Sequence, residues 1–224
     1  MAAGKGGRPA AGGGRWIEVA PARLARWLDG FAERHGQAAA SRTDAGLAVT
    51  AADGAVADCQ LPYGWRGAGT TPDELVAEAN AEDRIGLLLV RRGACAVGIA
   101  VGDKLLESKV DRRLVQGRSA AGGWSQQRFA RRREKQARES AEAGADTAAR
   151  LLLPRLDTLR AVVGGGDRKA VDAVLGDRRL APVAERVGGW FLDVPEPRHT
   201  VLVEAVVQAR TVRIRLTEPP PDRT

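Results

Sequence analysis

The chain has 224 residues, enough for one ample hydrophobic core or for one core with a small appendage. A formal net charge of +7 and a pI near 10.2 favour a polyanionic partner. No stretch reaches the roughly 18 apolar residues that a membrane span needs, and the start carries no apolar run typical of a signal peptide. We therefore expect a cytoplasmic protein with no membrane partner.

Cysteine and histidine are too sparse to suggest a metal centre. Cys59 and Cys95 lie far apart in apolar, strand-like surroundings, which predicts buried free thiols rather than a disulfide or a metal pair. His35 and His199 occupy separate segments, and neither accompanies a nucleophile elbow. The carboxylates near the expected sheet form no set that we would assign to metal-dependent nuclease chemistry: Asp83, Asp103, Glu107 and Asp111. We expect no metal and no cofactor.

The first 80 residues predict a disordered tail followed by a small α+β portion. Residues 1–14 are mostly Gly and Ala, which cannot bury enough surface to become ordered. Residues 15–80 then show a strand-like run at 15–19 and a helix from Pro21 to about His35. An Asp53-Gly54 pair between the runs 47–51 and 55–61 indicates a β-hairpin. A short helix begins at Pro72, with Thr71 as its N-cap.

Residues 84–217 predict a second, larger domain. Three apolar runs, at 85–90, 94–101 and 104–110, are joined by tight turns and indicate an antiparallel meander. A long helix should run from Ser125 or Gln126 to about Leu153. A strand at 159–163, a glycine turn at 164–166 and a helix at 168–175 follow. The glycine turn lacks the spacing of a phosphate-binding loop, so we expect an ordinary strand-to-helix turn. A helix near 200–209 and a strand at 212–216 complete the domain, and 218–224 should be disordered.

The long helix has only a thin apolar stripe. That stripe consists mainly of small residues: Phe129, Ala137, Ala141, Ala145, Ala148, Leu151 and Leu152. Its first turns are rich in arginine, although cations near a helix N-terminus are disfavoured by the helix dipole by a few tenths of a kcal/mol. We therefore expect these first turns to project from the body of the domain for a reason other than stability.

The segment before and within the start of this helix combines glycines with neutral amides. Gly122 and Gly123 allow backbone conformations with positive φ and a close approach to a substrate. Gln126 and Gln127 cannot act as general bases in water, but a glutamine can order a water molecule or position a backbone N–H for a developing oxyanion. The alternative is a glycine hinge whose glutamines are ordinary helix formers. The spacing alone does not decide between these two interpretations.

Basic residues surround the glycine–glutamine stretch. Those that we expect to contact RNA are Arg118, Arg128, Arg131, Arg132, Arg133 and Lys135. The alternative is a solvated run of charge. Trp124, inside the same stretch, could stack on a base or anchor the loop on the body of the protein.

The stretch Gly122-Gly123-Trp124-Ser125-Gln126-Gln127 resembles the Vms-like release factors, specifically their actinobacterial branch. These proteins are related to the catalytic domain of the eukaryotic class I peptide-release factor, which carries a Gly-Gly-Gln loop. The Vms-like branch carries a Gly-x-x-Gln form, matched here by 123–126. The order of elements is also similar, from the meander at 85–110 to the strand, turn and helix at 159–175. The resemblance covers about residues 84–215.

The resemblance implies an α/β fold: an RNase H-like sandwich of a mixed sheet with flanking helices, beside the smaller N-terminal α+β portion. It implies a peptidyl-tRNA hydrolase that frees nascent chains from stalled large ribosomal subunits, with ribosomal RNA and peptidyl-tRNA as partners. Gln126 would be the active residue of a loop spanning 117–127, with Gly122, Gly123, Trp124, Ser125 and Gln127 around it. Two alternatives remain open, an endonuclease acting at the tRNA 3′ end and a non-catalytic ribosome-binding protein. We expect a monomer.

Overall fold

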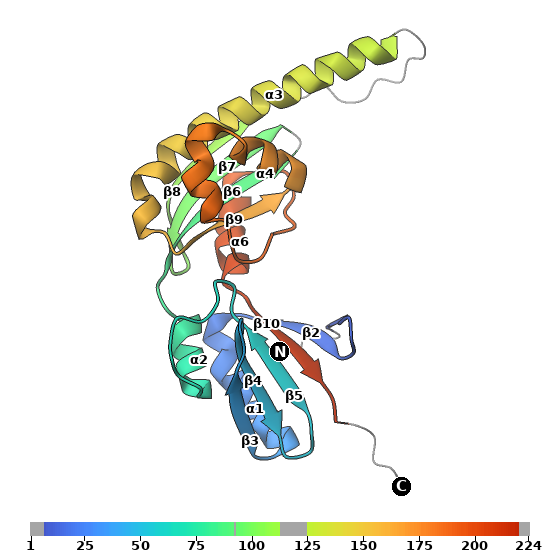
Figure 1. The fold of residues 1–224 in the computed structure, drawn as a ribbon, viewed down its shortest axis with the longest axis vertical. Coiled ribbons are helices and arrows are strands. Elements are labelled where there is room, and N and C mark those ends of the chain that lie inside the picture. The colour runs from blue at the N-terminus through green and yellow to red at the C-terminus, as the bar shows by residue number, and fades with distance from the viewer. Residues whose placement is uncertain (1–6, 92, 113–124, 220–224) are drawn as a thin grey trace. The chain divides into compact units, whose positions relative to one another are not determined.

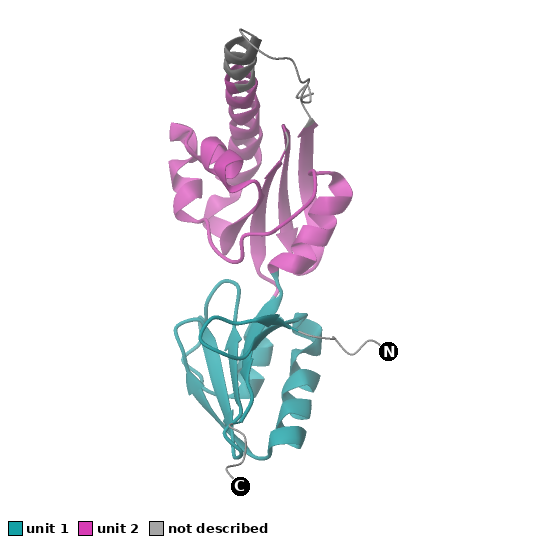
Figure 2. Ribbon diagram, turned by 90° about the vertical axis from the view of Figure 1, so that its right-hand side faces the viewer, with its two compact units in different colours: residues 1–81, 210–224 teal, residues 82–209 magenta. Residues whose placement is uncertain are grey.

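The computed structural model describes residues 7–91, 93–112 and 125–219, with the backbone alone for Arg112 and for 125–133. The expected loop at 117–127 therefore falls outside the described residues up to Trp124. The chain divides into two compact units, residues 1–81 with 210–224 and residues 82–209 (Figure 2). Each unit has its own sheet.

Unit 1 is built on an antiparallel sheet with the strand order β1-β2-β10-β5-β4-β3. The strands are β1 (Arg8–Pro9), β2 (Arg15–Val19), β3 (Ala38–Arg42), β4 (Gly46–Ala51), β5 (Val56–Gln60) and β10 (Val212–Thr217). The expected hairpin is present as β4 and β5, joined through a turn in which Gly54 has a φ of 91°. The open face of the sheet is polar, whereas alternate residues on the other face enter the core.

Two helices cover the apolar face of this sheet. A short 3-10 turn, η1 (Pro21–Arg23), leads into α1 (Leu24–His35), and α2 (Pro72–Ala79) follows the hairpin. Leu24, Leu28 and Phe31 of α1 are buried at the predicted three- and four-residue spacing. Thr71 caps α2 as expected and forms a capping box with Glu74. Hydrogen bonds to Thr71 lower the pKa of the Glu74 carboxyl.

Three features of unit 1 differ from the sequence expectation. Residues 7–14 fold back through glycines of positive φ so that β1 pairs with β2, where we expected a tail. The Ala-rich strand β3 gave no strand signal, but it pairs along β4. We expected β10 in the second domain, whereas it lies between β2 and β5 and buries Val212, Ile214 and Leu216 in unit 1.

Unit 2 contains the predicted meander in a four-stranded mixed sheet of order β8-β7-β6-β9. Strands β6 (Arg84–Arg91), β7 (Ala94–Val101) and β8 (Lys104–Arg112) are antiparallel, and β9 (Ala161–Gly166) is parallel to β6. Almost every residue of β6 and β7 is buried, as expected for strands covered on both faces.

Helices flank both faces of this sheet (Figure 1). On one face α3 (Ser125–Leu152) and α4 (Arg168–Leu175) pack on a core that includes Leu88, Val97 and Val162. On the other, α6 (His199–Ala209) packs on β6, β7 and β8. The mixed α/β fold class predicted from the sequence is confirmed, with a mixed sheet that helices flank on both faces.

Short elements join these layers. They are η2 (Leu153–Thr158), η3 (Arg178–Leu180) and α5 (Ala181–Glu185). The glycines expected to form a turn at 164–166 instead belong to β9. Neighbouring groups lie so close to this part of the strand that a side chain would collide with them. A Cβ on Gly164 would stand 3.2 Å from the Phe191 ring, and one on Gly166 would stand 2.4 Å from the carbonyl oxygen of Val90. The expected turn is wrong by three residues, and Asp167 caps α4 directly.

Candidate functional site

The glutamine singled out by the sequence lies at the start of α3. The helix begins at Ser125, so Gln126 and Gln127 occupy its first turn, as the sequence predicted. The side chains of Ser125, Gln126 and Gln127 are outside the described set, as are Arg118, Gly122, Gly123 and Trp124 entirely. The backbone places Gln126 at the positive end of a 28-residue helix, where a substrate anion would be favoured.

The positive charge of the chain is concentrated around this helix start. Residues 109–138 contain ten basic and two acidic residues, a net charge of +8, against +7 for the whole chain. The rest of the chain therefore carries a net charge of −1. Arg128, Arg131, Arg132 and Arg133 lie on the first turns of α3, with side chains outside the described set. Lys135 is exposed and lies 3.9 Å from Glu139.

Residues 144–152 form the root of α3, and of the described residues before it (134–143) only Ala141, which is half-buried, packs against the core. Of residues 134–143 none is buried, and the first buried residue is Gly144 (Figure 1). Ala137, expected in the apolar stripe, is exposed, whereas Ala145, Ala148 and Leu152 are buried as expected. At 1.5 Å per residue, Gln126 lies about 27 Å along the helix from Gly144. The helix thus carries its first turn well away from the sheet that supports it.

A glycine lets the root of α3 lie directly on the sheet. A Cβ on Gly144 would stand 2.9 Å from Cγ2 of Val174 and 3.3 Å from the sulfur of Cys95. Cys95 is buried beneath the helix, and this burial, with a smaller contribution from the charge of Asp111, raises the pKa of its thiol to about 12. The thiol therefore packs as a small apolar group.

Gly144→Ala is expected to destabilise unit 2. Alanine favours a helix by about 1 kcal/mol over glycine, but the new methyl group overpacks the contact with Val174 and Cys95, which typically costs about 1–3 kcal/mol. The matched control is Gly30→Ala in α1, where the new Cβ would find only Nη1 of Arg34, at 3.8 Å. Urea unfolding should show a lower midpoint for Gly144→Ala and a higher one for Gly30→Ala. A rise for both would mean that the root of α3 is loosely packed.

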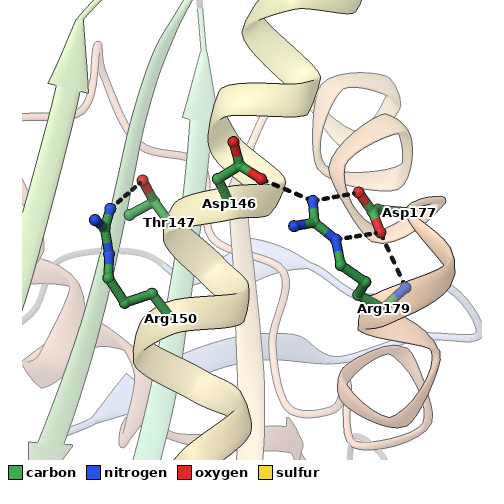
Figure 3. Close-up of polar contacts among 5 residues, drawn as sticks. All are labelled: Asp146, Thr147, Arg150, Asp177 and Arg179. Carbon is green, nitrogen blue, oxygen red and sulfur yellow. Dashed lines mark hydrogen bonds and ion pairs between the residues drawn. The ribbon is translucent and has the colours of Figure 1, made fainter.

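A buried threonine ties the root of α3 to the end of β8. Thr147 is 2% exposed, and its hydroxyl donates to Oδ2 of Asp111 at 2.5 Å. Arg150, one turn later, donates from Nη2 to the Thr147 hydroxyl at 3.4 Å (Figure 3). Lys109 approaches Asp111 to 4.0 Å. These contacts hold the helix against the strand that precedes residue 113.

An arginine ties the opposite side of α3 to η3. Nη2 of Arg179 donates to Asp146 of the helix at 2.8 Å and to Asp177 at 2.7 Å (Figure 3). Nε of Arg179 donates to the other oxygen of Asp177 at 3.0 Å. The bidentate fork fixes the guanidinium plane, so the third bond, to Asp146, has a defined direction. The bond to Asp146 was not predicted, because a local pattern carries no signal for partners 33 residues apart.

Asp177 makes the stability of this region dependent on pH. The hydrogen bond from the Arg179 side chain, and secondly that from the Arg179 backbone N–H, lower the pKa of Asp177 from 3.8 to about 2. A carboxylate whose pKa is lower in the folded state stabilises the fold when the pH is above its ordinary pKa. For Asp177 that contribution disappears as the pH falls from about 4 to about 2. Asp177→Asn is therefore expected to lower the urea midpoint at pH 7 but to differ less from the parent protein near pH 2. A difference independent of pH would contradict this assignment.

The part of the chain that the structure describes contains neither a metal-ligand cluster nor a membrane-spanning helix. No three His, Cys, Asp or Glu residues in the described ranges are grouped as metal ligands would be. None of the helices in those ranges combines the length and apolar character that crossing a membrane requires.

Comparisons with known proteins identify the class of the chain. Residues 83–215 match the model of a family of translation release factors, the Actinobacteria/chloroflexi VLRF1 release factor. Because the match covers more than half of the 224 residues, the chain belongs to this family. The resemblance to the actinobacterial Vms-like release factors, inferred from the sequence, is confirmed. A comparison with curated proteins found no match.

Two of the solved structures that the chain matches are archaeal proteins. The archaeal translation termination factor aRF1 is 19% identical, with a TM-score of 0.41, and the match covers 71% of this chain and 48% of that one. A structure described as an archaeal protein is 16% identical, with a TM-score of 0.38, and the match covers 72% of this chain and 51% of that one. The chain thus spans about half the length of the solved structures that it matches.

Proposed function

We propose that the protein is a peptidyl-tRNA hydrolase of the release-factor type, which frees nascent chains from stalled large ribosomal subunits. The observation that carries this proposal is the position of Gln126 in the first turn of a projecting helix, within a family of release factors. The substrate is the ester that joins the peptide to the ribose of the tRNA, and water is the nucleophile.

The neutral amide of Gln126 suits an ester that is already activated. Glutamine supplies no general base, so its contribution is to orient the attacking water or to hold a backbone N–H near the developing oxyanion. Gly122 and Gly123 permit the close approach of the backbone to the tRNA end. Water attacks the ester carbonyl, the bond to the ribose oxygen breaks, and a proton passes to that oxygen, giving a free peptide acid and a free tRNA.

The basic residues hold the polyanion. A net charge of +8 over residues 109–138, in a chain that is otherwise close to neutral, supports a contact confined to this end of the molecule. Arg118, Arg128, Arg131, Arg132, Arg133 and Lys135 would contact ribosomal RNA or the tRNA acceptor end. We propose that the protein acts as a cytoplasmic monomer.

The experiment that tests the proposal is a release assay on large subunits that carry peptidyl-tRNA, with the released tRNA sized on a gel. Release of peptide with a full-length tRNA is expected. A shortened tRNA would instead indicate an endonuclease that acts near the 3′ end. Tight binding without turnover on any ribosomal complex would indicate a binding protein.

A further inference from the structure

The angle at which α3 leaves the sheet determines the position of Gln126 in the first turn of the helix. The lever from Thr147 to Gln126 is 21 residues, or about 32 Å. A tilt of about 10° at the root therefore moves the first turn by about 5–6 Å. Since a misplacement of about 1 Å can cost a reaction about 10²-fold, the site tolerates only about 2° of tilt.

Two polar contacts brace the root on opposite sides. Neighbouring residues of a helix point about 100° apart, and Figure 3 shows Asp146 directed to η3 and Thr147 directed away from it. The Asp146–Arg179 bond restrains tilt toward or away from η3, and the Thr147–Asp111 bond restrains it relative to β8. The apolar contacts of Gly144 and Ala148 fix the depth at which the helix lies on the sheet.

We propose that Asp146 with Arg179, and Thr147 with Asp111, are positioning residues that set the direction of α3 and thereby the place of Gln126. This inference rests on the proposed function. An exposed ion pair contributes little to stability, and Asp146 and Arg179 are both more than half exposed. The pair therefore contributes little to the stability of the fold, but it restrains the direction in which the long helix α3 leaves the sheet.

Asp146→Ala separates these two effects. Alanine is the better helix former, which offsets the loss of an exposed ion pair, so the melting temperature should change by less than about 2 °C. The substitution leaves the Arg179–Asp177 fork and the cap of η3 in place. The rate of peptide release at saturating ribosomal complex should fall about tenfold, with half-saturation unchanged. Asp146→Ala combined with Thr147→Val, which keeps the shape of the buried side chain, should lower the rate further.

Glu142→Ala is the matched control. Glu142 lies one turn before Asp146 on the same helix, is exposed, and forms no ion pair with any residue that the structure describes. The substitution removes the same charge from the same helix, so its release rate should equal that of the parent protein. An equal loss in both variants would attribute the effect to charge and would overturn the positioning role.

A second measurement reads the helix angle directly. Spin labels at Glu134→Cys on α3 and Asp172→Cys on α4 report the distance between helix and body. The native thiols do not compete for label, because burial raises the pKa of both Cys59 and Cys95 to about 12. The distance distribution should be narrow in the parent protein and should broaden in Asp146→Ala with Thr147→Val.

The outcomes separate the two proposals. A narrow distribution in the double variant, or an unchanged release rate in an active protein, would overturn the positioning role and leave the proposed function standing. A parent protein without release activity on any stalled complex would overturn the proposed function and the positioning role together. A broadened distribution together with a slower release step would support both.

Discussion

Gln126→Ala is expected to lower the rate of peptide release from stalled large subunits by about 10²-fold, with little change in binding. The magnitude is that typical of losing one group that orients the attacking water or an oxyanion donor. Because alanine is a better helix former than glutamine, the first turn of α3 is retained and the loss is one of chemistry. Single-turnover release at saturating protein measures the effect.

Two further variants locate the effect. Gln136→Ala makes the same change ten residues later on the same helix and should release peptide at the parent rate. Gln127→Ala tests the register of the motif, since Gly123-Trp124-Ser125-Gln126 has a second glutamine directly after it. We expect a smaller loss at Gln127 than at Gln126. Full activity in Gln126→Ala would remove this residue from the mechanism.

The sequence predicted the elements whose signals are local. The Asp53-Gly54 pair specified a hairpin because a tight turn of positive φ needs such residues, and the structure has it. The apolar runs of β6 and β7 indicated strands buried on both faces, and α3 begins at Ser125, one of the two starts predicted, Ser125 or Gln126. Each of these features is decided by residues that are neighbours in the chain.

The rest depends on partners that a local pattern does not encode. Strand β10 alternates Val212, Ile214 and Leu216 with arginines, which specifies a half-buried strand but not the sheet that it joins. The glycines 164–166 have the composition of a turn, and only the close approach of Phe191 and Val90 explains their place in β9. Likewise, nothing local marks Asp146 as the partner of Arg179, 33 residues later. The contacts that support the candidate site were thus not predictable from local patterns, whereas the helix start that carries Gln126 was.

Replacing Arg131, Arg132 and Arg133 together with glutamine is expected to weaken binding to the large subunit and to flatten its dependence on salt. If about five cations contact phosphates, the logarithm of affinity falls with that of salt at a slope of roughly −3.5, so affinity drops about 10²-fold between 50 and 200 mM salt. Without three of the contacts the slope becomes about −1.4, and the same change in salt costs only about sevenfold. Equilibrium binding at several salt concentrations measures both slopes.

The control removes the same charge from unit 1. Arg23, Arg26 and Arg34 are exposed in and just before α1, and replacing all three with glutamine lowers the net charge equally. Because counterions are released only where cations meet phosphates, this variant should keep the parent slope. An unchanged slope in the α3 variant would show instead that its arginines are a solvated run of charge. Equal flattening in both variants would attribute binding to overall charge and would remove the reason for placing the polyanion at the start of α3.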